Sequence, residues 1–150
     1  MVTVSDTRTA VTDLGGKAIV ELLTSVGHEV AAVEIVPDEP TQLRALLERM
    51  RDEATIDAVL ITGGTGIAAR DQTCEAVESL LTRSLPGFGE LFRMLSYAEI
   101  GAAAMLSRAT GGLMGRTIVL AMPGSPAGVE LAMRKIILPQ LAHLVREASR

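Results

Sequence analysis

Short apolar blocks and amphipathic stretches alternate along this chain. Ala58–Thr62 is apolar almost throughout, as strands in the core of a parallel sheet are. From Leu14 to Val26 the apolar residues recur every three or four positions, which predicts an amphipathic helix. The same patterns predict strands over 1–5, 29–36, 58–62, 107–115 and 117–122. They predict helices over 14–26, 43–50, 73–81, around 91–95, and over 129–145.

Glycine and proline residues separate these elements. Pro37–Pro40 breaks the second strand, and a glycine-rich loop over 63–73 precedes the third helix. Leu85–Glu90 has the composition of a turn, and Pro123–Pro126 ends the last strand. We expect Pro139 to kink or divide the closing helix.

The order strand, helix, strand, helix, strand, loop, helix predicts the fold class. It is typical of a three-layer α/β domain with a mostly parallel, doubly wound sheet, to which the hairpin over 107–122 adds an antiparallel part. The 150 residues, 48% of them hydrophobic, suit a single domain over 1–150. Aromatic residues make up only 2%, so aliphatic side chains must fill the core.

Charge and composition exclude several classes of protein. The net charge is −4 and no block of Lys or Arg is present, so the chain lacks the basic face that nucleic-acid binding requires. A single cysteine, Cys74, rules out a disulfide framework, and we interpret it as buried filler rather than a reactive thiol. No apolar run approaches a membrane span, and no secretory signal is visible. We therefore expect a cytoplasmic protein whose ligands are small molecules.

Polar or glycine-rich segments follow four of the predicted strands. In a sheet of this kind ligands bind beyond the carboxyl ends of the strands, so we expect these segments to meet at one edge. They are Ser5-Asp6-Thr7, Pro37-Asp38-Glu39, Gly63-Gly64-Thr65-Gly66 with Asp71, and Pro123-Gly124-Ser125-Pro126.

The Gly63–Gly66 turn is a candidate phosphate site. It has no bulky side chains to block a close approach, its backbone N–H groups can face an anion, and Thr65 adds a hydroxyl donor. It is not a Walker A loop, since no Gly-Lys-Ser/Thr follows, and its glycine spacing does not match the dinucleotide fingerprint. The alternative is a tight turn before a helix.

Asp38 and Asp71 are the candidate metal ligands and catalytic acids. Each lies just beyond a strand end, and one or two carboxylates commonly hold the Mg²⁺ that bridges phosphate oxygens in nucleotidyl transfer. Alternatively, Asp38 could cap the helix after Pro40, and Asp71 could cap the helix that starts at Thr73.

Arg70 and Arg108 could clamp a phosphate or a pterin carbonyl, although an isolated arginine is more often a solvated surface residue. His28 and His143 do not cluster with other metal-ligating residues, so a zinc site is not expected. Nothing suggests a hydrolase triad.

At these loops the sequence resembles the MoaB/Mog family of molybdenum-cofactor biosynthesis proteins, which includes the G domain of gephyrin. The resemblance covers nearly the whole chain, in the family's order. Leu91–Gly101 is similar to the MoaB branch in particular. The matching segments are Val4–Arg8, Val36–Glu39, Leu60–Gly66 with Arg70-Asp71, Pro86–Glu90, Leu106–Arg108 and Met122–Pro126.

The resemblance implies a fold, an assembly and an activity. The fold is the doubly wound α/β domain, assembled as a trimer or hexamer. The activity is ATP- and Mg²⁺-dependent adenylylation of molybdopterin, with release of pyrophosphate. Asp38 and Asp71 would serve the metal and catalysis. The family's members usually carry more residues before their first strand, so a short first strand is expected here.

The resemblance also implies which residues line the pterin, phosphate and nucleotide pocket. Glu90 matches a position at the pocket rim. The implied substrate-binding set is Ser5, Asp6, Thr7, Gly63, Gly64, Thr65, Gly66, Arg70, Glu90, Ser107, Arg108, Pro123, Gly124 and Ser125.

Two other roles stay open at this point. The chain could be a non-catalytic molybdopterin-binding or carrier protein of the same pathway. It could also act as a scaffold through its oligomer surfaces, with other enzymes of the cofactor pathway as partners. Apolar residues at 91, 92, 94 and 95 beside Tyr97 could form such an interface or belong to the core.

Overall fold

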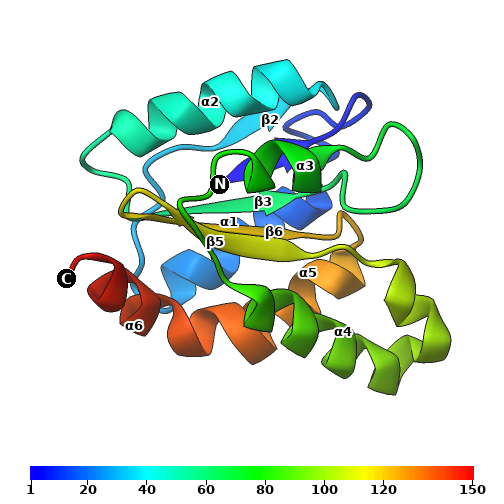
Figure 1. Cartoon of the computed structure of the whole chain (residues 1–150). Coiled ribbons are helices and arrows are strands. Elements are labelled where there is room, and N and C mark those ends of the chain that lie inside the picture. Colours follow the sequence, from blue (N-terminus) through cyan, green and yellow to red (C-terminus); the bar gives the residue numbers. More distant parts are fainter.

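The computed structural model describes residues 1–150. Six strands form one mixed sheet at the centre of the molecule (Figure 1). In spatial order they are β2 (Glu34–Val36), β1 (Val2–Val4), β3 (Ala58–Thr62), β6 (Thr117–Met122), β5 (Thr110–Met114) and β4 (Arg83–Ser84). The first four run parallel, and the β5–β6 hairpin is antiparallel. The short β4 pairs antiparallel with β5. The predicted fold class, including the hairpin, is confirmed.

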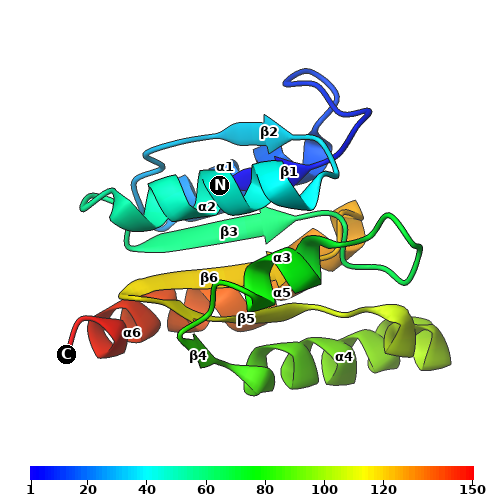
Figure 2. The ribbon, with the colours of Figure 1, turned by 45° about the horizontal axis from the view of Figure 1, so that its top comes forward.

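Helices cover both faces of the sheet. One face carries α2 (Pro40–Asp52) and α3 (Thr73–Glu78). The other carries α1 (Leu14–Ser25), α4 (Pro86–Ile100), α5 (Pro126–Ala132) and α6 (Leu138–Ala148), as Figure 2 shows from a second direction. None of the helices is both long and apolar enough to cross a membrane.

Strand alternation divides the core into two layers. Successive side chains of a strand point to opposite faces of the sheet. In β6, Leu120 and Met122 pack with the larger helical layer, and Val119 and Ala121 pack against α2 and α3. The central strand is therefore buried on both faces, as its unbroken apolar run predicts.

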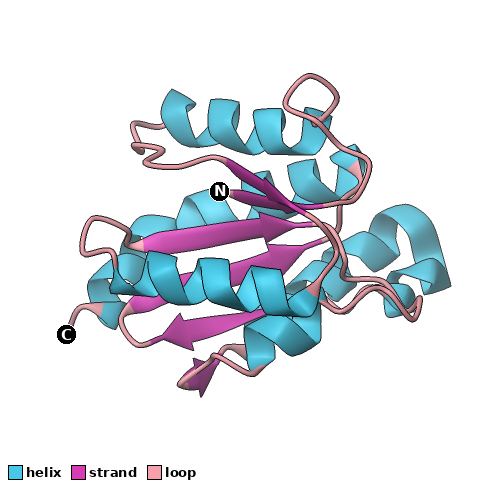
Figure 3. Ribbon diagram, turned by 90° about the horizontal axis from the view of Figure 1, so that it is seen from above, coloured by secondary structure: helices cyan, strands magenta, loops and turns pink.

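The strand order places a crevice at one edge of the sheet. The chain leaves β1 toward β2 on one side and later returns as β3 on the other, which is a topological switch point. Figure 3 shows the loops gathered at the end toward which the parallel strands point. This edge is where the sequence predicts the site.

Two predicted boundaries are wrong for identifiable reasons. The strand expected over 29–36 is limited to Glu34–Val36, because the short β1 offers partners only from Val2, which pairs with Glu34. The turn expected at Leu85–Glu90 is instead the start of α4, where Pro86 occupies the first turn of the helix.

Position 89 of this helix requires glycine, because a Cβ there would lie 2.3 Å from the Ala109 carbonyl oxygen. The glycine therefore allows close packing of α4 against the chain entering β5.

The last predicted elements are also subdivided. Residues 101–106 form a 3₁₀-helix, η1 (Gly101–Leu106). The hairpin arm begins at Thr110 rather than at 107, because the Arg108 N–H donates to the Thr65 carbonyl instead of pairing with a strand. The closing helix consists of α5, a π-helical segment η2 (Met133–Ile137) and α6. Pro139 lies in the first turn of α6, so the expected division at this proline is confirmed.

Candidate functional site

The loops after β1, β3 and β6 are in direct contact. Thr62 Oγ1 donates to the Pro123 carbonyl at 2.9 Å, and the Gly63 N–H donates to the Met122 carbonyl at 3.1 Å. Gly63 has φ +102°, and a Cβ there would lie 2.3 Å from the Val4 carbonyl oxygen. Only glycine permits both this backbone conformation and this approach. Asp6, after β1, in turn accepts the N–H of Asp38, after β2. The prediction that the four chain breaks meet at one edge is therefore confirmed.

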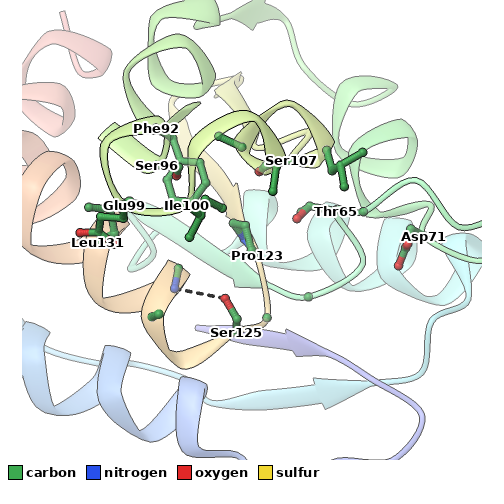
Figure 4. Close-up of a pocket in the computed structure, with 18 of the residues that line it drawn as sticks. Thr65, Asp71, Phe92, Ser96, Glu99, Ile100, Ser107, Pro123, Ser125 and Leu131 are labelled. Atoms are coloured by element: carbon green, nitrogen blue, oxygen red, sulfur yellow. Dashed lines mark hydrogen bonds between the residues drawn. The ribbon is translucent and has the colours of Figure 1, made fainter. Parts of the chain in front are cut away.

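A cavity of about 400 Å³ opens beside these loops (Figure 4). Its volume is in the usual range for small-molecule sites. Nine of the residues predicted to bind substrate or metal line it: Gly63, Gly64, Thr65, Gly66, Asp71, Ser107, Pro123, Gly124 and Ser125.

Sequence reasoning missed the opposite wall of this cavity. Phe92, Ser96 and Ile100 come from α4, and in Figure 4 they lie across from the loops that carry Thr65 and Ser125. Leu131 of α5 and residues of η1 complete this side. Phe92 and Ser96 are buried, whereas Leu91, Met94 and Tyr97 on the same helix are exposed. The spacing of apolar residues in the sequence of α4 predicts a helix, but it does not show whether a given face lines a cavity, belongs to the core or forms an interface.

Asp38 and Asp71 lie against the same glycine turn. A Cβ on Gly64 would be 3.3 Å from Asp38 Oδ1, and one on Gly66 would be 2.6 Å from Asp71 Oδ2. Burial, and then the negative charge of Asp71, raise the pKa of Asp38, against a smaller opposing effect of the Gln72 backbone N–H. The two acids are therefore close enough to interact electrostatically, as the sequence predicts.

The alternative capping roles of both acids are wrong. Glu39 is the N-cap residue of α2 and Gln72 that of α3, and neither helix has a side-chain cap. Asp71 Oδ2 instead accepts the Ala68 N–H at 2.9 Å and so closes the loop before α3.

Arg108 is tied to the protein rather than free in the cavity. Its Nε donates to the Gly66 carbonyl at 2.7 Å, and its other nitrogens reach the Glu75 carboxylate and the Asp71 carbonyl. It borders an adjoining hollow of about 430 Å³ that Asp71 also lines. The guanidinium thus holds the loop over 66–71 in shape.

Arg70 forms an ion pair with Asp6. Asp6 Oδ1 also accepts the Asp38 N–H at 2.9 Å, so this first loop supports the loop that carries Asp38. Asp6 and Arg70 do not line the main cavity. Their observed role is to connect the three loops around the acids.

Ser5, Thr7 and Glu90, also predicted to bind substrate, lie outside the cavity lining. Ser5 Oγ accepts the N–H groups of Thr7 and Arg8, each at 3.2 Å, and so stabilises a turn. Glu90 is exposed on α4. The family's residue pattern marked these positions, and their roles in substrate binding stay predictions.

Cys74 is inert, as expected. Its Sγ donates to the Arg108 carbonyl at 3.1 Å, and burial raises the pKa of the thiol to about 11. The thiol therefore stays protonated at neutral pH.

The donor set fits Mg²⁺ better than a transition metal. No group of three or more His, Cys, Asp or Glu side chains is present that could hold a metal by itself. Two carboxylates beside a glycine turn with open backbone suit a hard cation that keeps several waters and takes further oxygens from phosphates.

A family model and a curated relative both relate this chain to molybdenum-cofactor biosynthesis. A family model described as "Probable molybdopterin binding domain" matches residues 1–143. Molybdenum cofactor biosynthesis protein B of Bacillus subtilis is 56% identical over 149 residues, which are 98% of this chain and 87% of that protein.

Solved structures agree with this relationship. A crystal structure of a molybdenum cofactor biosynthesis protein B has a TM-score of 0.96 at 51% identity, covering 99% of this chain and 93% of that one. The molybdopterin biosynthesis enzyme MoaB from Thermus thermophilus has a TM-score of 0.87 at 39% identity, covering 99% of this chain and 93% of that one. The chain therefore belongs to the MoaB/Mog family of molybdenum-cofactor biosynthesis proteins.

Proposed function

We propose that this protein of molybdenum-cofactor biosynthesis is a molybdopterin adenylyltransferase. It transfers the adenylyl group of ATP to molybdopterin, with Mg²⁺, and releases pyrophosphate. The observation that carries this proposal is the meeting of Asp38 and Asp71, from separate loops, at a glycine turn that lines a ligand-sized cavity.

The two walls of the cavity suit the two parts of the pterin substrate. Phe92, Ile100 and Leu131 offer an apolar surface for the flat ring system. Across from them, the backbone N–H groups of Gly64, Thr65 and Gly66 and the Thr65 hydroxyl can receive the terminal phosphate, whereas the Gly63 N–H is already bound to the Met122 carbonyl.

In the proposed reaction an oxygen of the molybdopterin phosphate forms a bond to the α-phosphorus of ATP. The bond from that phosphorus to the oxygen bridging the α- and β-phosphates breaks, and pyrophosphate leaves with the electron pair. The attacking phosphate is ionised at neutral pH, so no side chain has to act as a strong base. The protein contributes by positioning both phosphates and by neutralising their charge.

Asp38 and Asp71 are the residues that would hold Mg²⁺. When bound there, the cation would neutralise charge on the phosphate oxygens as it develops during transfer. Arg108 and Arg70 keep the loops of these acids in place from outside the cavity.

Asp71→Asn tests the proposal because it removes a charge and little volume. We expect pyrophosphate release from ATP and molybdopterin to fall at least about a hundredfold, while molybdopterin binding, followed by pterin fluorescence, stays near wild type. Asp52→Asn, at an exposed carboxylate on α2, is the matched control and should change neither.

Equal loss of binding and transfer in a folded Asp71→Asn protein would contradict the division of roles. Wild-type protein that binds molybdopterin but releases no pyrophosphate would support the carrier function instead.

We also propose that the protein assembles as a homo-oligomer, a trimer or a hexamer. On α4, Leu91, Met94 and Tyr97 recur at three-residue spacing and expose 47%, 60% and 65% of their surface. Met105, 77% exposed, extends this apolar surface into η1. A contiguous apolar surface of this kind is typical of a protein interface.

A further inference from the structure

Thr73 has a buried hydroxyl that no group in the protein satisfies. The residue is 1% exposed, and its Oγ1 is the only buried side-chain nitrogen or oxygen without a hydrogen-bond partner. A hydroxyl left in this state destabilises the fold, because it has lost its hydrogen bonds to water and gained none in return. An unpaired hydroxyl that persists beside a candidate site therefore calls for a functional explanation.

This hydroxyl is directed toward the glycine turn and Asp38. The Thr73 N–H donates to the Gly64 carbonyl at 3.1 Å, which joins the start of α3 to the turn. A Cβ on Gly64 would lie 2.2 Å from Thr73 Oγ1, 3.2 Å from Thr73 Cβ and 3.3 Å from Asp38 Oδ1. The hydroxyl and the carboxylate thus both lie within 3.3 Å of the point where a side chain of residue 64 would begin, and the absence of that side chain lets the hydroxyl pack against the turn.

We propose that Thr73 Oγ1 is the third protein oxygen of the cation site, beside Asp38 and Asp71. This inference rests on the proposed function, because it assumes a divalent cation at the two acids. Mg²⁺ prefers oxygen ligands, and a threonine or serine hydroxyl serves as a neutral ligand in P-loop proteins. A neutral donor adds an oxygen without adding charge to two carboxylates that already repel each other.

A purely structural role for the hydroxyl is disfavoured by its lack of any partner. Thr73→Val replaces the hydroxyl with a methyl group of similar size. Without a cation, we expect this variant to unfold at the wild-type temperature or slightly above it. Thr73→Ser keeps the oxygen, removes the methyl group, and is the reciprocal control.

The test is a titration of the purified proteins with Mn²⁺, followed by the electron paramagnetic resonance signal of the free ion. We expect Thr73→Val to bind Mn²⁺ about tenfold more weakly than wild type, and Thr73→Ser to stay within about threefold. Asp38→Asn tests whether the two acids bind the cation at all, and it should also weaken Mn²⁺ binding.

The possible results show whether only the role of Thr73 fails or the whole cation site fails. Wild-type affinity in Thr73→Val overturns the role of Thr73 and leaves the two-acid site intact. No Mn²⁺ binding by wild type, or unchanged binding in Asp38→Asn, overturns the cation site and this inference together. A Thr73→Val protein that is unstable or does not fold without a cation shows that the hydroxyl has a structural partner, and it also overturns the inference.

Discussion

At the scale of single residues, the site is built at some cost to stability. Burial and the charge of Asp71 raise the pKa of Asp38, so the folded protein takes up a proton there more readily than the unfolded chain. The contribution of this carboxyl to stability is therefore fully present below its unfolded-state pKa. It is lost as the pH rises through the folded-state pKa. Functional sites commonly lower the stability of the fold in this way.

Asp38→Asn should relieve this cost at neutral pH. Without divalent cations we expect the variant to be slightly more stable than wild type at pH 7, because the fold disfavours the charged form of Asp38, and to gain nothing at a pH below both pKa values. Thermal unfolding of wild type and variant at several pH values measures the difference in stability at pH 7 and at low pH. A loss of stability at pH 7 would show that the charged form of Asp38 is favoured by contacts in the fold.

The sequence predicted where these residues lie better than it predicted their hydrogen-bond partners. The two acids, the glycine turn and Pro123–Ser125 could be identified because carboxyl ends of parallel strands share an edge. The orphaned hydroxyl of Thr73 could not, since only coordinates reveal that a hydroxyl has no partner. Likewise, nothing in the sequence showed that Arg108 would be used to bind the loop.

At the scale of elements, one arginine organises the loop between β3 and α3. Arg108 follows η1, yet it contacts the Gly66 carbonyl, the Asp71 carbonyl and the Glu75 carboxylate. Its own N–H also donates to the Thr65 carbonyl at 3.0 Å. The position of Asp71 therefore depends on a segment some forty residues further along the chain.

Arg108→Ala should loosen this loop. We expect a loss of about 1–2 kcal/mol in the free energy of unfolding, and faster hydrogen exchange of the amides over 66–72. Arg134→Ala removes an exposed ion pair with Glu130 on the helical layer and is the control, expected to cost about 0.3–0.5 kcal/mol. Unchanged exchange over 66–72 in Arg108→Ala would show that the loop is held by other contacts.

Element boundaries differ from the prediction where tertiary context decides them. A valine- and alanine-rich stretch such as 29–33 has the composition of a strand, but it needs a neighbouring strand to become one. Pro86 and Gly87 suggested a turn, whereas proline in the first helical turn and close packing at Gly89 allow α4 to begin there.

At the scale of the whole molecule, the two faces of α4 have different tasks. Phe92 and Ser96 face the cavity, and Leu91, Met94 and Tyr97 face outward. The spacing of apolar residues in this helix could predict neither assignment, since apolar side chains occur on both faces. The apolar wall of the cavity was therefore missed, although the polar edge of the sheet was found.

Met94→Glu should disturb the proposed assembly without unfolding the subunit. We expect wild type to elute as a trimer or hexamer in size-exclusion chromatography with light scattering, and the variant to shift toward the monomer. Gln42→Glu adds the same charge at an exposed position of α2, on the opposite face of the sheet, and is the control that should keep the wild-type mass. A monomeric wild type would contradict the proposed assembly.

The central claim is that Asp38, Asp71 and the glycine turn form one site for a cation and phosphates. The most direct measurement is a crystal structure of the protein with molybdopterin, a non-cleavable ATP analogue and Mn²⁺, located by its anomalous signal. The account predicts an anomalous peak within about 2.0–2.3 Å of oxygens from both acids, with phosphate against the amides of residues 64–66. Bound substrates with the metal elsewhere, or with phosphate away from this turn, would contradict it.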